Sequence, residues 1–130
     1  MFAEDAASAA AGITIMATGD GTATVAMIVD AGMTNGHGST HGGWVFLLAD
    51  TAFALACNSA GMPTVAARAD IAFLAPTGVG DELIAEATER VRRGRSGIYD
   101  VTVRCAGEVV AEFRGTSREL PVRDPAVHDG

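Results

Sequence analysis

The sequence predicts an α+β fold in which a β-sheet wraps around one long, apolar helix. Residues 44–57 are apolar except for Asp50 and Thr51, and the segment is too long for a typical buried strand. The rest of the chain contains five or six short segments typical of strands, with turn signals between them. Because a helix that is apolar on all sides must be covered, we expect the strands to form a sheet around it.

The elements before the helix follow from local composition. Residues 3–11 are rich in alanine and are expected to form a short helix or to fray. Segments 13–16 and 22–29 are predicted strands, and Asp20-Gly21 between them is typical of a hairpin turn. Residues 32–43 are polar and glycine-rich, so they are expected to form a loop.

Four strands are predicted after the helix. Residues 58–63 end the helix, since Gly and Pro lie just beyond its last apolar residues. Residues 83–93 suit a helix by composition but also alternate between apolar and polar side chains, so both interpretations are open from this pattern. The four predicted strands are residues 64–75, 83–93, 98–105 and 109–117.

The sequence contains no internal repeat and no linker, so residues 12–120 are predicted to form one domain. Residues 1–11 are then an N-terminal segment, and residues 121–130 are a loose C-terminal tail. A chain of 130 residues can bury a sizeable core without disulfides or metals.

Composition and charge argue against several functions. The nine basic residues are all arginines, and with 16 acidic residues they give a formal net charge of −7, which disfavours nucleic-acid binding. No apolar run reaches membrane-spanning length, and the acidic N-terminus lacks the basic region of a secretory signal. Cys57 and Cys105 lack the C-x-x-C spacing of zinc or redox sites. We expect a cytoplasmic protein with no metal and no membrane partner.

Gly42 and Gly43 open the predicted helix. The first four N–H groups of a helix have no intrahelical partner, and the helix dipole favours negative charge beside them. Glycine allows a ligand to approach this backbone closely. The pair is therefore consistent with a phosphate cradle or an oxyanion hole, or with a simple turn. The common nucleotide-binding glycine motifs are absent.

Asp50 is the only charged residue between His41 and Arg68. A carboxylate buried without a partner is costly, so Asp50 either has a structural partner or faces a cleft. We favour the second interpretation, with Asp50 as a nucleophile or general base. Thr51 is expected to hydrogen-bond back to the preceding helical turn.

Three polar residues, Asn35, His37 and His41, lie in the loop before the helix. Metal ligation is disfavoured because a Cys pair and an H-E-x-x-H helix are both missing. Asn35 suits a positioning role, and His37 is interpreted as a surface residue. His41 either caps the helix or takes part in catalysis.

Helix geometry separates two of these candidates. Gly42 and Asp50 are eight positions apart in the sequence, which corresponds to about 12 Å along a helix. An Asp side chain cannot reach that far. If both groups serve one reaction, they must come from two helices packed antiparallel, and the sequence then predicts a two-fold dimer with two shared sites.

The sequence resembles the hotdog-fold acyl-CoA thioesterases of the phenylacetic-acid-degradation, or PaaI-like, branch. The combination of His-Gly-Gly with a helical Asp is fairly specific for that branch, whereas many hotdog proteins share the β-rich segments. The similarity covers about residues 12–118. It is carried by residues 35–43, 48–53, 56–58, 73–76, 80–83, 94–95, 97–101 and 113–115.

The resemblance implies a curved antiparallel sheet around a helix of about residues 42–58, and it implies that residues 83–93 form a strand. Family members are dimers that often pair into tetramers. The matching residues imply that Asp50 attacks the thioester or activates water, that the Gly42 N–H polarises the carbonyl, and that Asn35 orients substrate or water. No cofactor is implied beyond the coenzyme A of the substrate.

We therefore predict an acyl-CoA thioesterase that favours phenylacetyl or another aryl group, with medium-chain acyl groups as the alternative. A non-catalytic acyl-CoA-binding module is a second alternative. A hotdog dehydratase ranks lower, because it needs an Asp–His pair at a different spacing. Trp44, Phe46, Phe53 and Tyr99 either line an aromatic acyl pocket or fill the core.

The predicted site has four catalytic candidates, Asp50, Gly42, Asn35 and His41. Some relatives hold the catalytic water with a Ser or Thr on the third strand, where this chain has residues 66–69, Ala-Ala-Arg-Ala. A second group of candidates could bind the substrate and its coenzyme A, because arginine suits phosphate and glycine allows close approach. They are Gly43, Arg68, Arg93, Gly94, Arg95 and Ser96. For residues 93–96 the alternative is a solvated turn.

Overall fold

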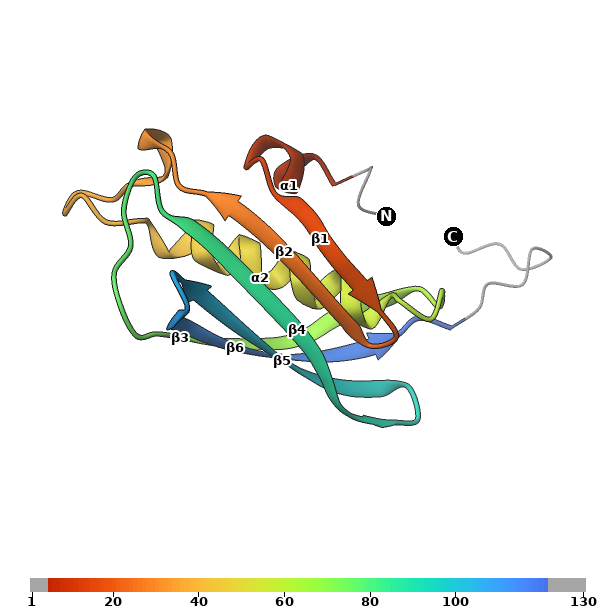
Figure 1. Cartoon of the computed structure of the whole chain (residues 1–130). Coiled ribbons are helices and arrows are strands. Elements are labelled where there is room, and N and C mark those ends of the chain that lie inside the picture. Colours follow the sequence, from red (N-terminus) through yellow and green to blue (C-terminus); the bar gives the residue numbers. More distant parts are fainter. Residues whose placement is uncertain (1–4, 122–130) are drawn as a thin grey trace, which may run out of the picture.

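The structure is a computed structural model that describes residues 5–121, and within them six strands form one antiparallel sheet that curves around a long helix (Figure 1). The sheet order is β1-β2-β4-β5-β6-β3. The helices are α1 Ala6–Ala10 and α2 Gly42–Cys57, with a short 3₁₀ turn η2 at Ala31–Met33. The strands are β1 Thr14–Gly19, β2 Thr22–Ile28, β3 Thr64–Phe73, β4 Glu82–Arg93, β5 Ser96–Cys105 and β6 Glu108–Glu119. The predicted α+β architecture is confirmed.

Three tight hairpins order most of the sheet. Gly21, Gly94 and Gly107 have positive φ angles in the β1-β2, β4-β5 and β5-β6 turns, where a side chain would be strained. The ambiguous segment 83–93 lies within β4, which pairs with β2 on one side and β5 on the other. The strand interpretation is therefore correct.

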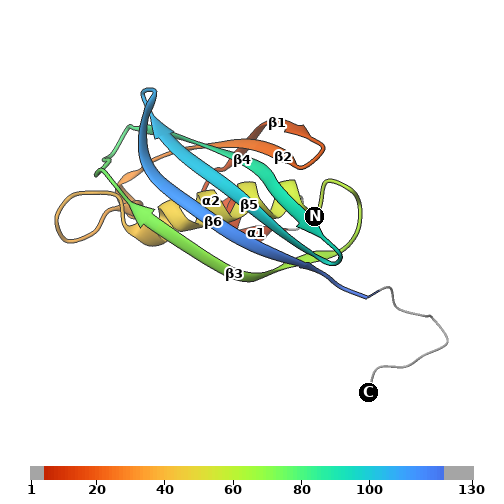
Figure 2. The same ribbon diagram turned by 90° about the horizontal axis from the view of Figure 1, so that it is seen from below.

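Strand β3 holds a different position. It follows α2 and pairs with β6 at the end of the sheet, so its other edge has no partner within residues 5–121. All of its residues are partly or fully exposed. Figure 2 shows this edge running along one side of α2.

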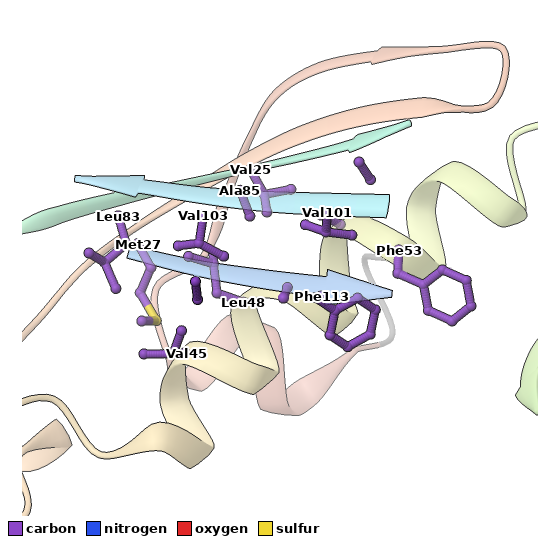
Figure 3. Close-up of a cluster of buried hydrophobic side chains, with 14 of the residues drawn as sticks. Val25, Met27, Val45, Leu48, Phe53, Leu83, Ala85, Val101, Val103 and Phe113 are labelled. Atoms are coloured by element: carbon purple, nitrogen blue, oxygen red, sulfur yellow. The ribbon is translucent and has the colours of Figure 1, made fainter. Parts of the chain in front are cut away.

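The core lies between the concave face of the sheet and the inner face of α2 (Figure 3). Fully burying one large apolar side chain contributes roughly 1.5–3 kcal/mol, so this interface fixes the orientation of the helix. The strand residues at this interface alternate as predicted. The principal buried residues are Val25, Met27, Val45, Leu48, Ala49, Ala52, Phe53, Leu83, Ala85, Val101, Val103 and Phe113.

The aromatic residues divide into two groups. Phe53 and Tyr99 are 1% and 3% exposed, and their ring centroids lie 5.6 Å apart in the core. Trp44 and Phe46 are only partly buried. Phe53 and Tyr99 therefore fill the core and do not line an open acyl pocket.

The chain ends are described in part. The predicted N-terminal helix is present as α1, but residues 1–4, including most of the acidic N-terminus, lie outside the described residues. The predicted C-terminal tail lies outside them too, apart from Pro121. No helix in residues 5–121 is both long and apolar enough to cross a membrane.

Gly115 sets how closely α2 approaches β6, and substitution there tests this packing. A Cβ at Gly115 would lie 2.8 Å from three ring carbons of Phe53. Gly115→Ala should destabilise the fold by about 1–3 kcal/mol in urea unfolding, because the core cannot take extra volume without strain. Gly36→Ala is the control, since nothing lies within 4 Å of its added Cβ. Equal stability of the two variants would contradict this account.

Candidate active site

The start of α2 presents one free amide. His41 is the N-cap, and its Nδ1 accepts a hydrogen bond of 2.9 Å from the Gly43 N–H. The Trp44 N–H donates to the His41 carbonyl at 3.0 Å. The Gly42 N–H has no partner within residues 5–121. Of the first three helical amides, only that of Gly42 is available to a ligand.

Asn35 is held rigidly near this helix end. Its Oδ1 accepts hydrogen bonds from the N–H groups of His37 at 2.8 Å and Ser39 at 3.2 Å. No group in residues 5–121 accepts a hydrogen bond from Asn35 Nδ2. This amide nitrogen can therefore donate to a bound molecule. The His37 residue is exposed.

An open cavity of about 500 Å³ lies at the N-terminal end of α2. Gly42 borders it beside Phe73 at the end of β3, and a Cβ on Gly42 would lie 3.0 Å from the Phe73 ring. Glycine therefore keeps the free amide accessible from the cavity. The lining is polar near the loop and apolar elsewhere, and consists of Asn35, Ser39, Thr40, Gly42, Val45, Phe73, Leu74, Ala75, Pro76, Thr77 and Val110.

Asp50 does not line this cavity. It is half-buried on the face of α2 that points away from the sheet, together with Leu47 and Ala54, which follow helical spacing. No hydrogen bond or ion pair from residues 5–121 reaches its carboxyl. Burial raises the pKa of Asp50, and the negative charge of Asp5 raises it further. The ionised form of Asp50 is therefore disfavoured by its surroundings, and its carboxylate is available to a bound molecule.

The neighbouring Thr51 hydroxyl donates to the Leu47 carbonyl at 2.8 Å, as predicted. Since α2 is continuous from Gly42 to Cys57, Gly42 and Asp50 are separated by about 12 Å along its axis. Within one chain, the free amide and the free carboxylate do not meet.

The arginine candidates lie elsewhere in the single chain. Arg68 is exposed on β3, where its Nε lies 3.4 Å from an oxygen of Asp70. The turn at residues 93–96 lies beside the C-terminal end of α2, because the Glu119 N–H donates to the Arg95 carbonyl and the Leu120 N–H to that of Pro63. This is the opposite end of the helix from the free amide (Figure 1).

Sequence reasoning missed two groups near the site. Phe73 and the segment 74–77 form much of the cavity wall, although their apolar run ending in Pro was visible in the sequence. Asp5, which acts on Asp50, lies in an alanine-rich segment without any recognisable motif.

Residues 37–112 match the thioesterase superfamily, and the chain belongs to that family. The predicted hotdog, PaaI-like resemblance is confirmed.

Individual relatives extend this result. The chain is 46% identical over 121 residues to the acyl-coenzyme A thioesterase PaaI of Escherichia coli, covering 92% of this chain and 86% of that protein. The structure of E. coli PaaI, from the phenylacetic acid degradation operon, superposes with a TM-score of 0.91 at 45% identity, covering 93% of this chain and 88% of that one. Streptococcus mutans smu.793, solved with acetyl CoA bound, gives a TM-score of 0.81 at 25% identity, with 86% and 91% coverage.

Asp50→Asn tests whether the carboxylate has a structural role. A raised pKa means that the folded protein prefers protonated Asp50, so its contribution to stability is present below about pH 4 and is lost as pH rises through the folded-state pKa. Asp50→Asn should therefore increase the free energy of unfolding at pH 7. The increase should shrink in acid.

Asp100→Asn is the matched control. Hydrogen bonds from Arg114 at 2.7 and 2.9 Å lower the pKa of Asp100. The stability that the ionised Asp100 contributes is present above the unfolded-state pKa and is lost as pH falls through the folded-state pKa. Asp100→Asn should therefore be less stable than wild type at pH 7. Urea unfolding across this pH range measures both. Destabilisation by Asp50→Asn at pH 7 would show a structural role.

Proposed function

We propose that this protein hydrolyses acyl-CoA thioesters to a free acid and coenzyme A, at a site shared by two subunits. The observation that carries the proposal is the free Gly42 amide at the cavity, paired with a free Asp50 carboxylate that one chain cannot bring to it. Membership of the thioesterase superfamily and the similarity to an acyl-CoA thioesterase support the substrate class.

The Gly42 amide acts as the oxyanion donor. When the thioester carbonyl is attacked, negative charge develops on its oxygen, and a fixed N–H at a helix N-terminus stabilises that charge. His41 and Asn35 position this end of the site: His41 caps α2, and Asn35 offers its free amide to water or substrate. The Gly43 amide is used by the cap, so Gly43 contributes open space.

Asp50 of the partner subunit supplies the attack. Burial and the charge of Asp5 raise the pKa of Asp50, so its carboxylate is a stronger base than that of an ordinary Asp. It either adds to the thioester carbon, giving an anhydride that water opens, or takes a proton from the attacking water. In both routes the C–S bond breaks and coenzyme A leaves as a thiolate. No further cofactor is used.

The shared site requires two copies to pair along β3. The free β3 edge exposes backbone groups, and it runs along one side of α2 (Figure 2). Antiparallel pairing of two such edges places the two α2 helices side by side with opposite directions. We propose that such dimers assemble further into a tetramer.

The same pairing places the partner's residues 93–96 toward the Gly42 end of the site, because that turn lies at the C-terminal end of α2. We propose that Arg93, Gly94, Arg95 and Ser96 bind the coenzyme A phosphates there, and that Arg68 on β3 contacts the nucleotide or a polar acyl group. For the acyl group we favour phenylacetyl or another aryl group, since the relative PaaI comes from a phenylacetic acid degradation operon.

A panel of acyl-CoAs tests the activity. Release of coenzyme A should be fastest with phenylacetyl-CoA or benzoyl-CoA; a preference for hexanoyl-CoA or octanoyl-CoA would favour the medium-chain alternative. Asp50→Asn should lose about 100- to 10,000-fold in kcat while remaining folded. Binding of every panel member without hydrolysis would instead identify a non-catalytic acyl-CoA-binding module.

The oxyanion donor is tested in the same assay by two substitutions at Gly42. Gly42→Pro removes the N–H at a position where helices accept proline, and His41 has the extended ψ of 133° that precedes proline readily. Gly42→Ala keeps the N–H and adds a similar contact with Phe73. Proline should lose about 100-fold more activity than alanine. Equal losses would contradict the assignment.

A further inference from the structure

The short helix α1 docks on α2 through a buried pair of hydroxyl groups. Ser8 is 0% exposed, and its Oγ lies 2.8 Å from Oγ1 of Thr51, the residue that follows Asp50. Thr51 is also buried, and because the Ser8 hydroxyl gives its hydrogen to Asp5, the single Thr51 hydroxyl hydrogen is shared between Ser8 Oγ and the Leu47 carbonyl one turn earlier. A buried, fully paired contact of this kind fixes where α1 lies on α2.

The contact between Ser8 and Thr51 also fixes the position of a second carboxylate, that of Asp5. Asp5 is the N-cap of α1, and its two carboxyl oxygens accept hydrogen bonds from the Ser8 N–H at 3.0 Å and the Ser8 hydroxyl at 2.5 Å. Asp5 is therefore tied to the residue that contacts Thr51. A continuous chain of hydrogen-bonded groups runs from the Asp5 carboxylate to the helix segment that carries Asp50.

We propose that α1 is a positioning element for the reaction, in which the Asp5–Ser8–Thr51 chain holds the negative charge of Asp5 near Asp50 and strengthens Asp50 as the attacking group. Asp5 touches no substrate in this role and acts only through Asp50. The inference rests on the proposed function, because it assigns Asp50 the task described above.

The charges around Asp50 support this role. The hydrogen bonds from Ser8 lower the pKa of Asp5, so Asp5 stays charged at neutral pH. The pKa of Asp50 is raised by burial first and by Asp5 second. The other titratable neighbour is Cys57 on α2, whose thiol has a pKa raised to about 11 and is neutral at pH 7. In residues 5–121, the strands packed against α2 add no charge that acts on Asp50.

Asp5→Asn isolates the charge, because Asn caps a helix as well as Asp does. The Asp50 carboxyl carbon is followed by NMR during a pH titration in ¹³C-Asp-labelled protein, with its signal assigned by comparison with Asp50→Asn. We expect the Asp50 titration to move to lower pH in Asp5→Asn, and the acid limb of kcat/KM to move with it. Since Asp5 is only partly buried and solvent screens its charge, activity at neutral pH should fall by less than about fivefold.

Three controls separate charge from structure. Asp20→Asn removes a charge from the distant β1-β2 turn and should leave the Asp50 titration unchanged. Thr51→Val removes the docking hydroxyl and should shift the titration in the same direction as Asp5→Asn, whereas Thr51→Ser should restore it. In 1 M salt the difference between Asp5→Asn and wild type should nearly vanish.

The titration does not depend on activity, so the two proposals can fail separately. If wild-type protein hydrolyses no thioester but the Asp50 titration moves in Asp5→Asn, the proposed function is wrong and the coupling of α1 to Asp50 stands. If the Asp50 titration is the same in Asp5→Asn and wild type at low salt, the role of α1 is overturned, whatever the activity.

Discussion

The rigid length of α2 is the constraint on which the site depends. Its first amide is free to stabilise negative charge, and its free carboxylate stands about 12 Å further along the same axis. A packed helix cannot bend to close that distance. The sheet covers one face of α2 and α1 contacts it at Thr51, and in the proposed dimer the second copy lies against the face that carries Asp50. Chemistry that needs both groups therefore makes the dimer a requirement of the active site.

The energetics of the carboxylates point in the same direction. Asp100 is paired with Arg114 on the sheet surface, where ionisation is favoured, whereas Asp50 is half-buried without a partner in the described chain and ionisation is disfavoured. A carboxylate that weakens the fold in this way supports the proposed role of Asp50 in the reaction. Close packing at Gly115 and Phe53 holds that helix in place.

Local sequence patterns were sufficient for most of the fold. The apolar run and its cap predicted α2, and the alternating segments predicted the strands. Segment 83–93 was ambiguous because Ala, Glu and Arg favour helices, and pairing on both edges of β4 overrode that preference. The cavity could not be predicted, since it forms where the end of β3 meets the start of α2, far apart in sequence. The docking of α1 includes the contact between Ser8 and Thr51, which lie far apart in the sequence and leave no periodic signal.

A mixed-subunit measurement tests the shared site most directly. Asp50→Asn and Gly42→Pro chains carrying different affinity tags are combined, and heterodimers are purified through both tags. Each heterodimer then contains one site with an intact Gly42 amide facing an intact Asp50, and one site with neither. The account predicts inactive parents and a heterodimer with about half of the wild-type kcat, because one of its two sites works. A heterodimer no more active than its parents would show that the two groups do not meet across the subunit interface.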